Sequence, residues 1–170
     1  MVANNDPDDL LGPLSVGDLD QEYGDVMLRN HGSWIKSKES REIIMADGLK
    51  GTGFPITIMD TAAVAGMTEA KSVRFEVSAE KSIGMAKTNT PSMDLYIEAK
   101  GIDLSGKEIT RRVIASHPGG QAKCTAFGAL LAIKTILSTT KKGFLFLEYL
   151  MDLDLAFKEM KDEGMEITFQ

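Results

Sequence analysis

The sequence predicts an α+β fold in which a largely antiparallel sheet packs against one long apolar helix and a C-terminal helix. Three observations support this prediction. Residues 72–80 alternate between apolar and polar side chains, as a strand with one buried face does. Residues 93–100 and 107–115 predict two more strands around a glycine-containing turn. Residues 121–137 contain no proline and are rich in alanine and leucine, which favours a helix.

Composition indicates a single globular domain. The chain has 170 residues, 43% of them hydrophobic and 26% charged, which is enough to bury a core without a metal or disulfides. Its formal net charge of -6 argues against nucleic acid as a partner. We expect a cytoplasmic protein that does not enter a membrane, because there is no run of about 18 apolar residues and no signal peptide. Residues 1–14, with three aspartates, are expected to form a flexible arm, and residues 15–170 the domain.

The first half of the domain is expected to hold short elements joined by turns. Ser15 and Asp18 have the spacing of a capping box and predict a short helix. Asn30, His31 and Gly32 favour a hairpin turn between two short apolar segments. The remaining expected elements are a strand over 41–45, a flexible glycine-rich connection over 48–53, a strand over 55–59 and a helical turn over 61–65.

The strand over 72–80 separates its side chains between two faces. We expect one face to be buried, with Val73, Phe75, Val77 and Ala79. We expect the other face to be exposed, with Arg74, Glu76, Ser78 and Glu80. Residues 81–92 contain glycine, asparagine and proline, which predict a mobile loop before the strand over 93–100.

The helix over 121–137 is apolar around almost its full circumference, so we expect it to be buried on most sides. Its charged residues, Lys123 and Lys134, are three turns apart and fall on one narrow edge. Cys124 lies within it and is expected to be a buried, inert thiol. Asp152 predicts the cap of a C-terminal helix, which is followed by a strand over 165–169.

The glycine loop before the long helix is the candidate binding site. Its glycines allow close approach of the backbone, and the free N–H groups of the helix N-terminus attract an anion. The residues predicted to bind an anionic small molecule, such as an amino-acid carboxylate, are His117, Gly119, Gly120, Gln121, Lys123 and Thr125. The alternative is a tight turn into a core helix, with the free N–H groups capped by an acidic side chain or by water.

Arg111 and Arg112 are the other candidate substrate-binding residues. Because they are adjacent on a predicted strand, they point to opposite faces of the sheet. One of them is expected to bind a carboxylate and the other to be surface charge. A solvated position is the plain alternative for each arginine.

Motifs of catalysis and cofactor binding are missing from the sequence. Two histidines and one cysteine, far apart, cannot form the usual zinc site, so no metal is expected. There is no nucleophile elbow, and the glycines of 48–53 match neither the dinucleotide fingerprint nor the phosphate loop. Motifs alone therefore leave the function and the catalytic residues open.

Several segments of the second half nevertheless share their order and spacing with a known family. They are residues 95–101, 105–107, 125–137, 142–148, 152–161 and 163–167. In this order they resemble the C-terminal, substrate-domain part of saccharopine dehydrogenase-like (saccharopine reductase-like) oxidoreductases. The N-terminal Rossmann half of that family, with its glycine fingerprint, is missing from this sequence.

The resemblance implies a substrate-binding and dimerisation domain of an NAD(P)-dependent oxidoreductase that acts on the C–N bond of an amino acid. It implies that NAD(P) is bound by a separate Rossmann-domain partner, so this chain is expected to bind no cofactor and to be inactive alone. A homodimer is also expected, because so short a chain cannot cover an open sheet face and an apolar helix. The alternative hypothesis is a non-catalytic α+β interaction module that self-associates or binds a protein partner.

Overall fold

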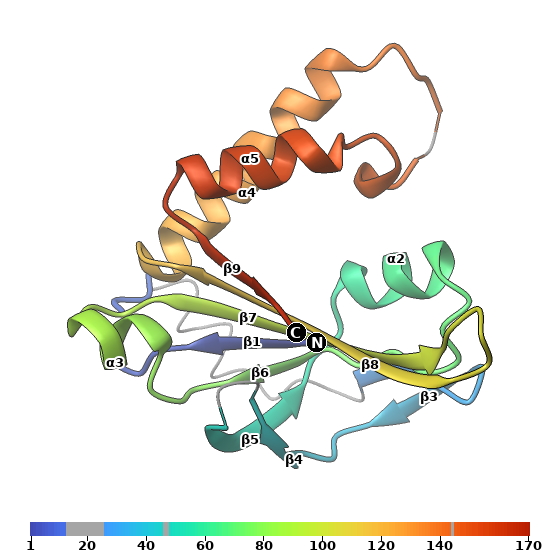
Figure 1. Ribbon diagram of the computed structural model, residues 1–170, viewed down its shortest axis with the longest axis horizontal. Coiled ribbons are helices and arrows are strands. Elements are labelled where there is room, and N and C mark those ends of the chain that lie inside the picture. The colour runs from blue at the N-terminus through green and yellow to red at the C-terminus, as the bar shows by residue number, and fades with distance from the viewer. Residues whose placement is uncertain (13–25, 46–47, 144) are drawn as a thin grey trace.

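The computed structural model describes residues 1–12, 26–45, 48–143 and 145–170 (Figure 1). The helix expected after Ser15 lies outside these residues. The strands are β1 (Val2–Asn5), β2 (Val26–Asn30), β3 (Ser33–Ser37), β4 (Arg41–Ile44), β5 (Lys50–Pro55), β6 (Glu76–Ser78), β7 (Met93–Ile102), β8 (Glu108–His117) and β9 (Glu166–Phe169). The helices are α2 (Met59–Met67), α3 (Ile83–Thr88), α4 (Gly120–Ser138) and α5 (Leu153–Asp162), with a short 3-10 helix at Leu147–Tyr149.

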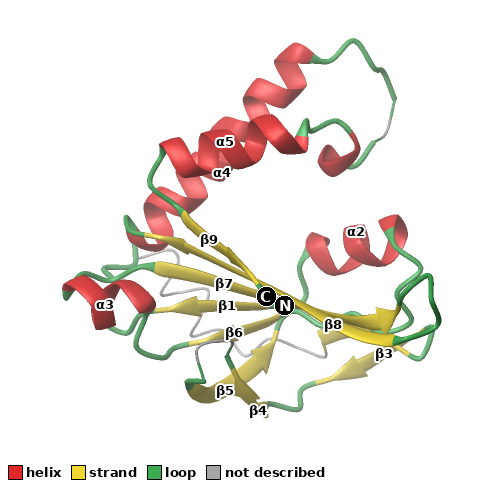
Figure 2. Ribbon diagram, in the orientation of Figure 1, coloured by secondary structure: helices red, strands yellow, loops and turns green. Residues whose placement is uncertain are grey.

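Seven of the strands form one sheet with the order β4-β5-β6-β1-β7-β8-β9 (Figure 2). β1 runs parallel to β6, and the other neighbouring strands of this sheet pair antiparallel. The remaining strands, β2 and β3, form the hairpin that the sequence predicts, with left-handed backbone at His31 and Gly32. The prediction of an α+β fold with a largely antiparallel sheet is confirmed.

The chain begins with an inner strand of the sheet, so the prediction of a flexible arm is wrong for this segment. β1 lies between β6 and β7. Its polar composition misled the prediction, because Asn4 is buried with hydrogen-bond partners. The Asn4 side chain is fully buried; its Nδ2 donates to the carbonyl of Glu80 at 3.0 Å, and its Oδ1 accepts from the Glu80 N–H at 2.9 Å. These bonds stabilise a strand that composition alone does not indicate.

β6 is shorter than predicted, and its two faces are reversed. The expected strand over 72–80 contracts to three residues, and Glu76 and Ser78 are buried instead of exposed. Glu76 is buried because its carboxylate binds both Arg41 and Arg74, each with a shortest distance of 2.7 Å. Alternation identifies the two faces of a strand, but an ion pair of this kind can place the polar face inside.

Three other segments also differ from their predictions. Most of the expected flexible connection over 48–53 belongs to β5, which begins at Lys50 and ends where the sequence predicts a strand over 55–59 to begin. The expected loop over 81–92 contains α3, whose first turn is capped by the Ser82 hydroxyl accepting from the N–H of Met85 at 3.2 Å. A strand partner and a helix cap outweigh the local glycine content in these segments.

α4 covers the predicted helix, but it is not buried on most sides. Its buried residues are Gly120, Phe127 and Leu131. The apolar residues that remain exposed along it are Leu130, Ile133, Ile136 and Leu137. The expectation of one long apolar helix, buried on most sides, is therefore not confirmed. Cys124 is partly buried, and desolvation raises the pKa of its thiol, which agrees with an unreactive cysteine.

The sheet carries its main core on one face and α4 on the other. The core cluster consists of Ile43, Met45, Tyr96 and Ile114. His117 follows Ile114 by three residues on β8, so it points to the opposite face, where its ring lies 6.3 Å from that of Phe127 on α4. α4 rises from the sheet, and α5 crosses α4 in the view of Figure 1. A 2.7 Å ion pair between Lys134 and Glu159 joins the two helices.

The C-terminal part of the prediction is confirmed. Asp152 caps α5 by accepting from the N–H of Leu155 at 3.1 Å, and Gly164 follows the helix with a φ of 89°. β9 then pairs antiparallel with β8 at the edge of the sheet. Within the described part of the chain, no helix has the length and apolar character needed to cross a membrane.

Candidate functional site

The predicted anion site lies where β8 ends and α4 begins. β8 ends at His117, and α4 starts at Gly120 after a tight turn. The N–H of Gln121, which is free of the helix itself, donates to Oδ2 of Asp9 at 2.7 Å. The position predicted for a ligand anion is therefore filled by a carboxylate of the same chain. This is the acidic cap that the sequence analysis leaves open as the alternative.

Gly120 is required by this arrangement. Its φ is 70°, a left-handed conformation that side chains other than glycine rarely adopt. A Cβ atom at Gly120 would lie 2.6 Å from both carboxylate oxygens of Asp9. At Gly119, a Cβ atom would meet the side chain of Lys123. The two glycines thus allow close packing around Asp9 and Lys123.

His117 is buried beneath this turn, with only 3% of its surface exposed. Its Nδ1 accepts from the N–H of Gly119 at 3.0 Å, so the proton of the neutral ring lies on Nε2. Nε2 is buried and has no hydrogen-bond partner among the described residues. Desolvation lowers the pKa of His117, which keeps the ring neutral near pH 7. The arrangement suits a packed, neutral histidine that shapes the turn.

The structure does not bring all the predicted site residues together. Lys123 and Thr125 are exposed on the first turns of α4, and Lys123 lies next to Gly119. Arg112 precedes His117 by five residues on β8, which places the two Cα atoms about 16 Å apart. Arg111 is exposed, and its side chain points to the face opposite to that of Arg112. Both arginines are thus separate from the start of α4.

A groove of about 510 Å³ lies next to Asp9, on the face of the sheet that carries α4. It follows the carboxyl ends of β1 and β6, the parallel pair of the sheet, and such ends are a common place for ligands in open sheets. Most of its lining is apolar. The lining residues are Asn5, Asp6, Pro7, Asp9, Leu11, Val26, Lys38, Phe54, Pro55, Ile56, Val77, Ser78 and Ala79.

One polar atom of Asn5 distinguishes the groove. The Oδ1 atom of Asn5 is buried and has no partner within the described part of the chain. The neighbouring carboxylate of Asp6 is already occupied, because it accepts from the N–H groups of Ser82 at 2.6 Å and Asp8 at 2.9 Å. Burial alone would raise the pKa of Asp6, but these hydrogen bonds outweigh it and lower the pKa. The groove therefore combines an apolar surface with one buried hydrogen-bond acceptor in its lining.

Sequence analysis misses Asn5 and Asp9 because both fall in the segment expected to be an arm. The described residues contain no cluster of histidine, cysteine, aspartate or glutamate suited to a metal ion. Comparison of the chain with models of known protein families, and with curated proteins, gives no match. The functional argument therefore depends on the groove, the start of α4 and the exposed surfaces.

Proposed function

We propose that this chain is the substrate-binding and dimerisation domain of a saccharopine dehydrogenase-like NAD(P)-dependent oxidoreductase. The substrate is an amino acid with a secondary amine, and the chain holds it in the groove. A separate Rossmann-domain partner supplies the NAD(P), so the isolated chain is inactive. The observation that supports this proposal is the unpartnered Oδ1 of Asn5 in a mostly apolar groove.

The chemistry of the groove matches a hydrogen-bond donor such as an amine. An amine N–H donates a hydrogen bond, and the Oδ1 of Asn5 is an acceptor without a donor. The volume of the groove, about 510 Å³, is within the range of pockets that bind small molecules. Phe54, Val77 and Ala79 provide apolar surface for an aliphatic chain.

Two probes of equal shape test this proposal. N-hexylglycine carries a secondary amine, which is protonated near pH 7, whereas hexyloxyacetate has an uncharged ether oxygen in its place and the same carboxylate. Pairing a buried acceptor contributes about 1–3 kcal/mol, so calorimetry should show N-hexylglycine binding roughly tenfold more tightly. In an Asn5→Ala variant, this preference for the amine should disappear. Equal affinity of the two probes for the parent chain would show that the groove does not recognise amines.

A second candidate function, the interaction module, is favoured by the apolar surface of α4 and α5. On α4, Ile133 is 55% exposed and Leu137 is 81% exposed. On α5, Leu153 is 62% exposed. Adjacent exposed apolar side chains of this kind mark interaction surfaces in soluble proteins. The proposed homodimer uses the same surface, so the two functions share this structural prediction.

Sedimentation analysis with paired variants tests self-association through this surface. Ile133→Glu with Leu137→Glu should shift the chain towards monomer, because each dimer would bury uncompensated carboxylates. Leu104→Glu is the matched control, since Leu104 is fully exposed on the turn between β7 and β8. A monomeric parent chain at tens of micromolar would argue against dimerisation, and loss of the dimer in the control would place the interface elsewhere.

A further inference from the structure

A second cleft, with a volume of about 340 Å³, opens on the face of the sheet opposite to α4. It lies on the face that carries the core residues Tyr96 and Ile114, and Arg112 shares this face because it precedes Ile114 by two residues. Its lining residues are Met1, Val2, Arg41, Glu42, Ile43, Ile44, Met45, Tyr96, Ile97, Glu98, Lys100, Arg112 and Val113. The cleft is thus separate from the groove next to Asp9.

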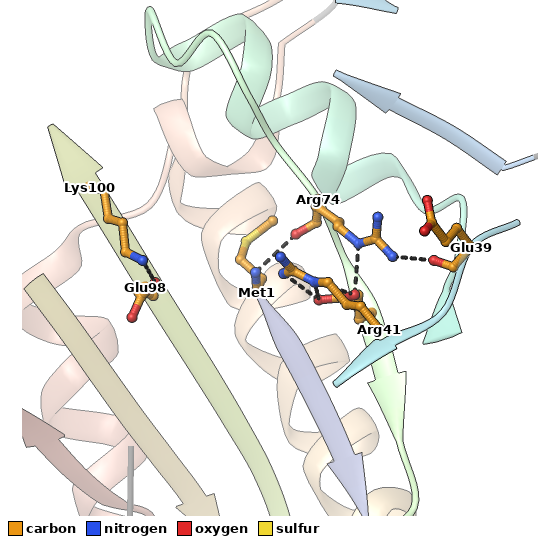
Figure 3. A network of polar contacts seen from close by, with 7 residues as sticks. Met1, Glu39, Arg41, Arg74, Glu98 and Lys100 are labelled. Carbon is orange, nitrogen blue, oxygen red and sulfur yellow. Dashed lines mark hydrogen bonds and ion pairs between the residues drawn. The ribbon is translucent and has the colours of Figure 1, made fainter. Parts of the chain in front are cut away.

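Arg41 is held at the cleft by a buried carboxylate (Figure 3). Its Nε donates to Oε1 of Glu76 at 2.9 Å, and its Nη2 donates to Oε2 at 2.7 Å. Arg74 donates from Nε to Oε1 of the same carboxylate at 2.7 Å. Glu76 is fully buried, and a bidentate guanidinium–carboxylate pair has a defined geometry. The Arg41 guanidinium is therefore fixed, while its Nη1 has no partner in the described structure.

Glu98 holds the other two cations of the cleft. Its Oε1 accepts from Lys100 at 2.9 Å, as Figure 3 shows, and its Oε2 accepts from Nε of Arg112 at 2.7 Å. These hydrogen bonds lower the pKa of Glu98 and keep it ionised. Both of its oxygens are occupied, whereas the two terminal nitrogens of Arg112 have no partner among the described residues. The cleft therefore has unused donors and few unused acceptors.

The charge of the lining side chains agrees with this inventory. Arg41, Lys100 and Arg112 are the cations of the lining, against the carboxylates of Glu42 and Glu98. The Glu42 carboxylate has its own partner at 3.6 Å, a lysine outside the cleft. A local excess of positive charge is notable in a chain whose net charge is -6. Such an excess attracts anions.

We propose that this cleft binds the carboxylate of a small organic acid. The terminal nitrogens of Arg112 and the Nη1 of Arg41 donate to the carboxylate oxygens, as guanidinium groups commonly do. Val2 and Ile43 contact the short aliphatic chain of the acid. This site does not depend on the proposed oxidoreductase function, because it shares no lining residue with the groove.

Hexanoate is a suitable probe, and hexanamide is its uncharged control. In an NMR titration of the labelled full chain, hexanoate should shift the backbone resonances of Glu98, Lys100 and Arg112. Arg112→Gln should weaken its binding about tenfold, since it removes charge-assisted hydrogen bonds. Arg111→Gln should leave the affinity unchanged, because it removes the same charge from the adjacent residue on the opposite face.

Three results would overturn the proposal. They are equal shifts from hexanamide and hexanoate, equal losses of affinity in the two arginine variants, and hexanoate shifts confined to residues outside the cleft. Arg112 is exposed, so its variant should fold; a melting curve like that of the parent chain verifies this. Lys100→Gln is a second variant with the same expected direction, and it keeps the test decisive if Arg112→Gln fails to fold.

Discussion

Asp9 and Gln121, which are 112 residues apart in sequence, are joined by a hydrogen bond of 2.7 Å from the backbone N–H of Gln121 to the carboxylate of Asp9. This bond connects the segment after β1 to the first turn of α4. It satisfies one of the N–H groups that a helix N-terminus leaves unpaired, and it places a negative charge at the positive end of the helix dipole. Asp9 also lines the groove, so one residue links the helix to the proposed substrate site.

Replacing Asp9 tests this link. Asp9→Ala should lower the free energy of unfolding by about 1 kcal/mol, as loss of a helix cap usually does. For a chain of this size, the melting temperature should fall by roughly 2–4 °C. Asp8→Ala is the control, since Asp8 is exposed and next to Asp9. Equal melting temperatures of Asp9→Ala and the parent would show that the bond does not stabilise the fold.

Two glycines of α4 should respond to alanine in opposite directions. Gly120→Ala should destabilise the chain by about 2 kcal/mol, because it strains a φ of 70° and displaces Asp9. Gly128→Ala should stabilise it by about 0.5–1 kcal/mol, because no atom lies within 4 Å of the added Cβ and alanine favours helix. Denaturant titrations measure both changes. The same sign for both variants would contradict this account of the turn.

Glu76 should make stability depend on acid pH. Burial alone would raise the pKa of Glu76, but the hydrogen bonds and charges of Arg41 and Arg74 lower it below its usual value. The ionised Glu76 carboxylate therefore contributes stability above the pKa of glutamate in the unfolded chain, about 4.3. This stability is lost as the pH falls through the lower pKa of the folded chain. The free energy of unfolding should therefore decrease below about pH 4.

Glu76→Gln isolates this contribution. At pH 7 the variant should be less stable by about 3 kcal/mol, because it leaves the arginines without their buried partner. Its free energy of unfolding should also fall less steeply below about pH 4 than that of the parent. Glu42→Gln is a control at an exposed ion pair on the neighbouring strand. An identical acid response of Glu76→Gln and the parent would contradict the assignment.

His117 should affect stability at a higher pH. Desolvation lowers the pKa of its ring in the folded chain, so the unfolded chain takes up the proton first. The stability that the neutral His117 ring contributes is present above the pKa of histidine in the unfolded chain, about 6.5. It is lost as the pH falls towards the lower pKa of the folded chain. His117→Gln should reduce the fall in stability between about pH 7 and 5. Urea titrations across this range compare the variant with the parent chain, and an unchanged pH dependence would contradict this account.

The second half of the fold is largely predictable from local signals. The hairpin of β7 and β8, the cap of Asp152 and the terminal strand follow from turn residues, alternation and helix capping, which act over a few residues. The exposure of α4 does not follow from local signals. An apolar helix has the same pattern whether its own chain or another molecule covers it.

The first half is harder to predict because distant partners determine its burial. Asn4 is inside because of the backbone of Glu80, and Glu76 is inside because of Arg41 and Arg74. Such pairings leave no periodic pattern in the sequence. The glycine loop before α4 is correctly located from its residues, but the carboxylate that occupies it comes from Asp9, in a segment that looks like an arm.

A crystal structure of the full chain with N-hexylglycine tests the central claim most directly. The proposal predicts the secondary amine within about 2.7–3.2 Å of Oδ1 of Asn5, with the hexyl chain against Val77 and Phe54. The probe also carries a carboxylate, so a second probe molecule can bind in the cleft of Arg41 and Arg112. An empty groove, or a probe in the groove whose amine points away from Asn5, would contradict the assignment of this groove as an amine-binding substrate site.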